Sequence, residues 1–236
     1  MPFPLAHPVA VLPFRRHYFK WLNFPALVIG SLVPDIGYLF HHASHFSHQA
    51  LGSILFSLPA GTLILAAFYF CRTPVVVRMP VGLRRSLLPL CRRPCGPVWI
   101  AILSLMIGIG THVLWDSFTH TDGWVVEHVP LLLSPLFQFD GRTARVCHLL
   151  WYASSFIGVG WLFIAFEKWK QNSVAATGGS RETAKGMLQD AIFLAILVIP
   201  VSLVHHLIRS PIGFALTAAL CFSLGVFFWK MAVATR

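Results

Sequence analysis

Three ionisable residues, His112, Asp116 and His120, follow one another at four-residue intervals near the middle of the chain. Residues four apart on an α-helix lie on the same face, one turn above another, so these side chains share one face. An imidazole and a carboxylate at that spacing can bind one metal ion together, or they can hydrogen-bond to each other. The pattern therefore predicts either a metal site or a polar pair that joins two helices.

The apolar run that carries this pattern, residues 97–118, is long enough to cross a bilayer. Ionisable groups in a membrane helix are costly unless they are paired or functional, so we favour a functional site. Asp35 is the other acid embedded in apolar sequence, directly after Pro34. Its carboxylate is a second candidate for the same site, although Asp is also a common residue at the N-cap of a helix.

The composition indicates a membrane protein. Apolar residues make up 56% of the chain and charged residues only 11%, whereas about 25% are charged in an average soluble domain. The net charge is +10, but the basic residues gather in short stretches between apolar runs. That arrangement is typical of membrane topology and of contacts with anionic lipid headgroups. We therefore expect membrane lipid, and no nucleic acid, as the partner of this chain.

We predict an all-α, multi-pass membrane protein with one domain, 1–236, and five to six membrane helices. The segment 24–40 is interrupted at Pro34 and fits a full span, a half-helix or a re-entrant element. Residues 1–166 carry the motifs, residues 167–187 are expected to form a flexible cytoplasmic linker, and residues 188–236 a helix pair. The five other predicted spans are 50–71, 97–118, 147–166, 188–208 and 211–229.

The loop at residues 72–96 sets the predicted topology. It contains six arginines and no acid, and such loops lie on the cytoplasmic side of a membrane. The segment 97–118 then crosses outward, which places His112 and Asp116 at its outer end. The three remaining spans cross inward, outward and inward again, which places the C-terminus in the cytoplasm.

Histidine nitrogens and carboxylate oxygens suit zinc and related divalent ions, so we looked for further ligands at the same depth. If the segment 24–40 is re-entrant, Asp35 and His48 lie at the outer membrane edge, and His7 can reach the site. If that segment is a full span, His7 lies on the cytoplasmic side. His120 is read equally well as a ligand or as an exposed loop residue. The candidate ligands are His7, Asp35, His48, His112, Asp116 and His120, and the candidate catalytic carboxylates are Asp35 and Asp116.

Three segments, residues 1–10, 28–35 and 111–124, resemble an uncharacterised bacterial membrane family of unknown function. The order of their parts is an early His, then Pro-Asp, then a His before a membrane helix, then His-x-x-x-Asp. This order is similar to the membrane-bound metal-dependent hydrolases and, more distantly, to the zinc-dependent phospholipases C. The resemblance implies that a metal, zinc above all, is bound in a bacterial inner membrane by His7, Asp35, His48, His112 and Asp116, with His120 as a further candidate. Where the hydrolases have His-Arg-Gly-x-Thr-His-Ser, this chain has His-Phe-Ser-His-Gln at 45–49.

Two functions fit these observations. The first is a metal-dependent hydrolase that acts on a phosphoester or another lipid-like substrate, with Asp35 or Asp116 as base to a bound water. The alternative is a non-enzymatic membrane protein in which the same groups form a polar network that supports assembly or an ion path. The sequence contains no Gly-x-Ser-x-Gly, phosphate-binding loop or dinucleotide motif, so serine hydrolases and nucleotide-dependent enzymes are not indicated.

Overall fold

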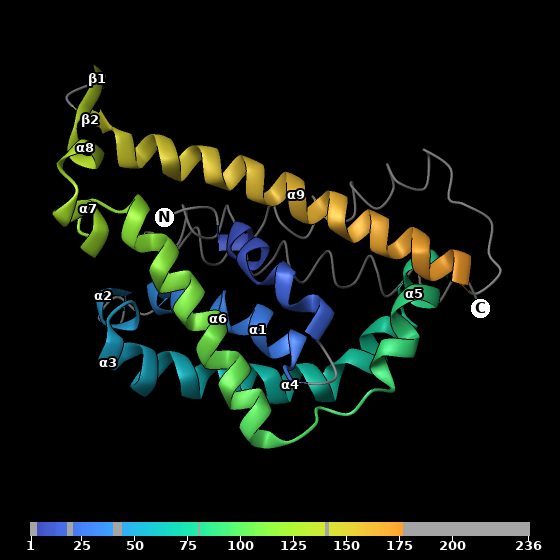
Figure 1. The fold of residues 1–236 in the computed structure, drawn as a ribbon. Coiled ribbons are helices and arrows are strands. Elements are labelled where there is room, and N and C mark those ends of the chain that lie inside the picture. The colour runs from blue at the N-terminus through green and yellow to red at the C-terminus, as the bar shows by residue number, and fades with distance from the viewer. Residues whose placement is uncertain (1–3, 18–20, 40–43, 80, 140–141, 177–236) are drawn as a thin grey trace, which may run out of the picture. The chain divides into compact units, whose positions relative to one another are not determined.

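The computed structural model describes residues 4–17, 21–39, 44–79, 81–139 and 142–176. It is mostly helical, as predicted (Figure 1). Its internal contacts divide the chain into two compact units, Met1–Phe70 with Pro94–Ala165 and Cys71–Arg93 with Phe166–Arg236. The single membrane domain expected from the sequence stays a prediction. The predicted spans 188–208 and 211–229 lie outside the described residues. All six candidate ligands belong to the first unit.

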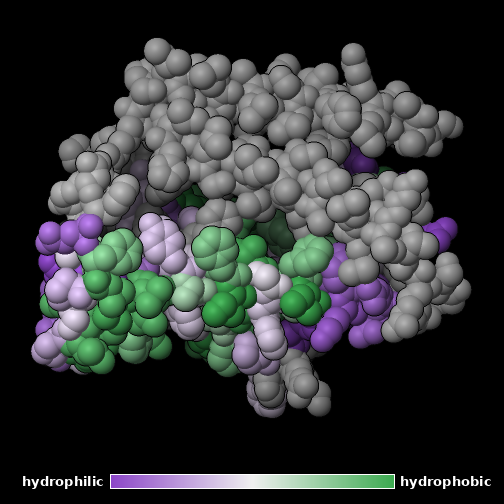
Figure 2. Space-filling view, turned by 90° about the horizontal axis from the view of Figure 1, so that it is seen from above, coloured by the Kyte–Doolittle hydropathy of each residue, from purple (hydrophilic) through white to green (hydrophobic). Residues whose placement is uncertain are grey.

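Three helical stretches are long and apolar enough to cross a membrane: Ala50–Val77, Val98–Thr119 and Val146–Ser173. Many of their large apolar side chains are exposed to the surroundings, among them Phe70, Leu114 and Phe156. Figure 2 shows such apolar side chains at the surface of the molecule beside polar ones. An exposed apolar surface of this kind is compatible with a lipid environment.

The segment 24–40 is not one continuous helix. It forms α1 (Phe24–Gly30) and then a separate 3-10 helix, η2 (Val33–Leu39). Asn23 caps α1, because its side-chain oxygen accepts a hydrogen bond from the Ala26 N–H at 2.9 Å. Pro34 disfavours an α-helical Val33, which explains why α1 ends before it. The interruption that the sequence predicts is therefore present, and whether the segment spans, half-crosses or re-enters a membrane stays a prediction.

Helix α1 packs closely against α6 (Val98–Thr119), which Figure 1 shows running beside it. Two glycines permit this approach. A Cβ on Gly108 of α6 would overlap the carbonyl oxygen of Leu27 and would lie 2.8 Å from the Ser31 nitrogen. A Cβ on Gly30 of α1 would overlap the carbonyl oxygen of Leu105. The two backbones are therefore in contact at the level where the candidate site begins.

The rest of the first unit surrounds this pair of helices. A 3-10 helix, η1 (Pro4–His17), contacts both α1 and α6. After η2, the short helix α2 (Ser44–Ser47) leads into a nearly continuous helix made of α3 (Ala50–Gly52), the π-helical turn η3 (Ser53–Ser57) and α4 (Leu58–Val77). After α6 come α7 (Trp124–His128) and α8 (Pro130–Leu133).

A small antiparallel hairpin departs from the all-α prediction. Strand β1 (Pro135–Phe139) pairs with β2 (Arg142–Arg145), with Phe137 opposite Ala144. The residues between the strands are Asp-Gly at 140–141, the sequence pair that favours two-residue hairpin loops. The prediction relied on hydropathy and did not use this Asp-Gly pair, so the hairpin was missed.

The second unit contains α5 (Val81–Cys91), which lies within the arginine-rich loop predicted at 72–96. The loop is closed by Arg72, whose guanidinium donates a hydrogen bond to the Arg93 carbonyl at 2.5 Å. Helix α9 (Val146–Ala176) begins in the first unit and ends in the second. Residues 167–176 are therefore helical, whereas we expected them to begin a flexible linker. This end of α9 carries a buried ion pair between Lys170 and Glu167, with a shortest distance of 3.3 Å.

Candidate metal centre

Helix α6 positions the two central residues of the site. His112 and Asp116 lie one turn apart on its buried face, with exposed fractions of 0% and 6%. The Nδ1 of His112 lies 2.8 Å from the backbone carbonyl of Ser31, at the end of α1. Because a carbonyl only accepts hydrogen bonds, Nδ1 carries the proton. In the neutral ring, the lone pair is then on Nε2, which faces Asp116.

His48 is held in the same way from the opposite side. Its Nδ1 lies 3.1 Å from the hydroxyl oxygen of Ser47, and that hydroxyl donates its proton to the Pro34 carbonyl at 2.9 Å. The Ser47 oxygen is therefore an acceptor for the Nδ1 proton of His48. The Nε2 of His48 is left with the lone pair, and it lies 3.3 Å from the Nε2 of His112.

Asp35 brings the second carboxylate, from the first turn of η2. Neither of its oxygens has a hydrogen-bond partner among the described residues, although both are buried. An N-cap aspartate would accept a hydrogen bond from a backbone N–H, so the capping role left open by the sequence is not the one found. The carboxylate is directed at the two histidines instead.

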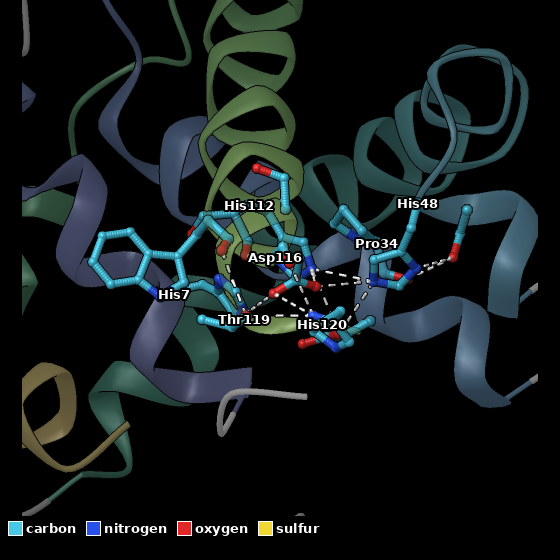
Figure 3. A network of polar contacts seen from close by, with 12 residues as sticks. His7, Pro34, His48, His112, Asp116, Thr119 and His120 are labelled. Atoms are coloured by element: carbon cyan, nitrogen blue, oxygen red, sulfur yellow. Dashed lines mark hydrogen bonds and ion pairs between the residues drawn. The ribbon is translucent and has the colours of Figure 1, made fainter. Parts of the chain in front are cut away.

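The four ligand atoms lie close to one another, and Figure 3 shows three of the residues that carry them, His48, His112 and Asp116. A tetrahedral zinc site with bonds of about 2.0–2.2 Å has ligand atoms about 3.3–3.6 Å apart. Here the His112 Nε2 lies 3.3 Å from Asp116 and 3.5 Å from Asp35, and the His48 Nε2 lies 3.5 Å and 3.6 Å from the same carboxylates. All four atoms lie within 4.8 Å of one another. The four separations between histidine and carboxylate, and the 3.3 Å between the two histidine nitrogens, match the ligand–ligand edges around a divalent ion.

The charges at this point also fit a cation. Two nitrogen lone pairs and two carboxylates converge there, and neither oxygen of Asp116 accepts a hydrogen bond from a described residue. The Oδ2 of Asp116 also lies 3.3 Å from the His112 Nε2, so the structure contains the His112–Asp116 pair that the sequence left open as an alternative. Two buried carboxylates at one point are costly, and a shared divalent ion would neutralise them. Asp35, His48, His112 and Asp116 are the residues that would hold it.

His7 reaches the site from η1, in agreement with the broken form of the segment 24–40. Its Nε2 lies 3.6 Å from the Oδ1 of Asp116, and its ring stacks on that of His112 with centroids 3.8 Å apart. Figure 3 shows Asp116 between His7 and His48. Burial, aided by the nearby His112, lowers the pKa of His7 to about 4. His7 is therefore neutral at neutral pH, which is the form that binds metals.

His120 is the first residue after α6. Its Nδ1 donates to the backbone carbonyl of Asp116 at 3.1 Å and lies 3.7 Å from the Oδ1 of that residue. Burial lowers the pKa of His120 as well. The structure thus places all six sequence-predicted residues together, four around one point and two on the outer oxygen of Asp116.

A cavity of about 430 Å³, a size typical of pockets for small molecules, adjoins two of the four ligands. His48 and Asp116 contribute to its wall, so the site can be reached from it. Burial raises the pKa of the Tyr38 hydroxyl, and Asp35 raises it further, so this hydroxyl stays a proton donor. The whole lining consists of Tyr38, His48, Gln49, Val113, Asp116, Ser117, His120, Asp122, Gly123 and Trp124.

Comparison with known proteins identifies a family but no activity. The model of the family DUF4184, described as a domain of unknown function, matches residues 1–235. The chain belongs to the DUF4184 family. No curated protein and no solved structure matches it significantly. The similarity to membrane-bound hydrolases therefore stays a prediction, and the function of this DUF4184 chain must be argued from its site.

Sequence reasoning missed the groups that orient the ligands. Ser47 and the carbonyl of Ser31 fix the two histidine rings, and Tyr38 lines the cavity. The Ser31 contact is made by backbone, which no sequence pattern reveals. Ser47 directly precedes His48 in the sequence. Only the structure shows that the Ser47 hydroxyl lies between the Pro34 carbonyl and the His48 ring.

Replacing Ser47 with alanine tests this orientation. The variant leaves the His48 Nδ1 without its acceptor, so the ring loses the preference that points Nε2 at the site. Loss of such an outer partner typically weakens metal binding about 10- to 100-fold, and we expect a loss in that range in zinc titrations of the detergent-purified protein. Ser154→Ala is the matched control, because that hydroxyl bonds only to the Trp151 carbonyl in its own helix at 3.1 Å among the contacts found. Equal affinities in both variants would contradict the assignment.

Proposed function

We propose that this DUF4184 chain is a metal-dependent hydrolase of a bacterial inner membrane that cleaves a phosphoester bond in a lipid-like substrate. The observation that carries the proposal is the set of four ligand atoms from Asp35, His48, His112 and Asp116, of which His48 and Asp116 line a cavity. Two nitrogen and two oxygen donors suit zinc, and they also suit other first-row divalent ions. We take zinc as the first candidate.

The donor set supports catalysis more than a purely structural role. Structural zinc sites are mostly built from cysteine and are closed, whereas catalytic sites keep a position open to water or substrate. Here no cysteine is among the ligands, and the cavity gives access to the site. A bound divalent ion would polarise a phosphoryl group and lower the pKa of a water molecule towards about 7.

The residues around the ion have separate tasks in this proposal. Asp35 and Asp116 hold the ion, and each has a second oxygen that can take a proton from the attacking water. Tyr38, kept protonated by burial, can donate a hydrogen bond to a phosphoryl oxygen of the substrate in the cavity. His48 and His112 are held in one tautomer by their outer partners and keep their lone pairs on the ion.

A lipid-like substrate is supported by the surroundings of the cavity. It lies at the C-terminal end of α6, where the apolar helix stops and an exposed Trp124 follows. Tryptophan is enriched at the interface between membrane and water, where lipid headgroups lie. If the arginine-rich residues 72–96 are cytoplasmic, the cavity opens on the outer surface of the membrane, and the C-terminus is cytoplasmic.

The proposal is tested with the full chain in detergent micelles. We expect elemental mass spectrometry to find at least one zinc per chain. We also expect the protein to hydrolyse a phospholipid with a chromogenic headgroup, at a rate that depends on zinc. His112→Ala should lower both the zinc content and the rate by more than about 100-fold, because a ligand matters more than its outer partners. His128→Ala is the control, since this exposed histidine bonds to the Trp124 carbonyl in its own helix.

Two results would count against the proposal. A wild-type protein without metal, and unable to take up zinc, would remove the metal site itself. A zinc-loaded protein that hydrolyses none of a panel of phosphoester lipids would favour the alternative, a non-enzymatic membrane protein with a polar network. In that case, His112→Ala should change the thermal stability of the protein, and neither the wild type nor the variant should hydrolyse the lipids.

A further inference from the structure

One side of the 3-10 helix η1 follows α9. A 3-10 helix has three residues per turn, so side chains three apart lie one above another. A Cβ on Gly158 of α9 would lie 3.0 Å from the Cβ of Ala6, so the two helices touch at this point. The residues of η1 in the same column as Ala6 are Val9, Leu12 and Arg15.

Beyond the contact at Ala6, the two helices enclose a cleft of about 480 Å³, a size typical of sites for small molecules. Trp161 and Ala165 form its wall on α9, and they share a face of that helix with Gly158, because they follow it by three and seven residues. We call this space the η1–α9 cleft. The residues of its wall are Val9, Leu12, Pro13, Arg15, Trp161 and Ala165.

Arg15 brings a positive charge to a wall that is otherwise apolar. Its side chain is exposed, and it forms no hydrogen bond or ion pair with the part of the chain that the structure describes. The described acids of the first unit lie elsewhere: Asp35, Asp116 and Asp122 at the candidate metal centre and its cavity, and Glu127 in α7. The guanidinium of Arg15 is therefore available to an anion from outside the chain.

The η1–α9 cleft lies towards one end of the apolar part of α9. Ala165 is about 28 Å along the helix from its first residue, Val146, and the hydrocarbon core of a bilayer is about 30 Å thick. Trp161 is 61% exposed, and both Trp and the charged ends of Arg side chains gather at the boundary between acyl chains and headgroups. An apolar cleft with a cation at that boundary complements a phospholipid, which has an acyl chain and an anionic phosphate.

We propose that the η1–α9 cleft binds one anionic phospholipid, whose headgroup lies on Arg15 and whose acyl chain packs along Leu12 and Trp161. Basic pockets between membrane helices bind anionic headgroups in this way. In the topology that the sequence predicts, this end of α9 faces the cytoplasm, where the anionic lipids are concentrated. The site is separate from the candidate metal centre, because Arg15 lies about 16 Å along η1 from His7.

The test counts lipids bound to the full chain in detergent by native mass spectrometry. A chelator removes metal, so that the candidate metal centre cannot bind a phosphate. The probes are phosphatidylglycerol, which is anionic, and phosphatidylethanolamine with the same acyl chains, which has no net charge. We expect the wild type to bind one phosphatidylglycerol roughly 5- to 10-fold more tightly than phosphatidylethanolamine, because of the charge of Arg15.

Arg15→Gln should remove this preference for phosphatidylglycerol. Arg85→Gln is the matched control, because Arg85 is an exposed arginine on α5 and its loss changes the net charge by the same amount. It should keep the preference of the wild type. An equal loss in both variants would overturn the inference, since binding would then follow the net charge alone, and so would a wild type without any preference.

Ala165→Phe tests where the acyl chain lies. The larger side chain fills the cleft, so it should weaken the binding of both lipids. Wild-type lipid binding in this variant would overturn the inference. A lipid-free dimer that the same substitution dissociates would also overturn it, because a second copy of the chain would then occupy the cleft. Circular dichroism checks the fold of each variant, and Arg15→Gln changes only an exposed side chain.

Discussion

Replacing Asp116 with asparagine is expected to weaken divalent-metal binding at least about 100-fold, because this carboxylate contributes a ligand and a negative charge at the centre of the site. Its Oδ2 faces His48 and His112, and its Oδ1 faces His7. Asparagine keeps the shape of the side chain but carries no charge. Zinc titration monitored by calorimetry, followed by metal analysis after dialysis, measures the loss.

Thermal stability provides an independent measurement for the same variant. Without metal, the Asp116 carboxylate lies 3.3–3.7 Å from imidazole nitrogens of His7, His48, His112 and His120, so removing its charge should leave the stability unchanged or lower it. With zinc at 100 times its dissociation constant, the wild type should gain about 2.7 kcal/mol, and Asp116→Asn should gain almost nothing. A gain in stability with zinc that the wild type shows and Asp116→Asn lacks separates a metal site from an ordinary buried polar pair.

Asp122→Asn is the matched control, because Asp122 lines the same cavity but is exposed and outside the ligand set. It should bind zinc as the wild type does and gain the same stability. A wild-type affinity in Asp116→Asn, or an equal loss in both variants, would show that the cluster is not built around a metal.

The helical part of the site was predictable, since it depends only on local periodicity. His112, Asp116 and His120 were placed on one face by their spacing, and α6 was recognised by its length and hydropathy. Asp35 was singled out because a carboxylate in apolar sequence needs a partner. These inferences use the order of residues along one element and no long-range contact.

The rest of the site could not be predicted, because it depends on how distant segments of the chain come together, and a single sequence does not show this. Whether His7 could reach Asp116 depended on the form of the segment 24–40, and hydropathy leaves a half-helix and a span nearly equivalent at that length. The division of the ligands between the two oxygens of Asp116 depends on side-chain directions of a few ångströms. The helical end of α9 was missed because the sequence from residue 173 onward is rich in Gly, Ser and Thr. We therefore placed the start of the linker at residue 167, although α9 continues to Ala176.

Gly108→Ala is expected to destabilise the protein, although alanine is the better helix former. Its Cβ would overlap the Leu27 carbonyl oxygen and would lie 2.9 Å from the Gly30 Cα, so α1 would have to move away from α6. Overpacking of this kind typically costs about 1–3 kcal/mol, and contact with backbone atoms places this case at the upper end. The midpoint of thermal unfolding in detergent measures the effect.

Gly110→Ala is the matched control on the same helix. Nothing lies within 4 Å of a Cβ at Gly110, so the substitution should gain the propensity difference of about 0.5–1 kcal/mol. The two substitutions are chemically identical and two residues apart, but they should shift the unfolding midpoint in opposite directions. Shifts of the same sign would contradict the close packing of the two backbones.

Gly108→Ala should also weaken zinc binding, although Gly108 itself contacts no ligand atom. The Ser31 carbonyl that orients His112 lies one residue after Gly30, at the end of α1, and Asp35 follows four residues later. A displacement of α1 therefore withdraws the Ser31 acceptor from His112 and shifts Asp35 relative to Asp116. A zinc affinity that falls in Gly108→Ala but not in Gly110→Ala would show that the glycine contact between α1 and α6 sets the spacing of the ligands.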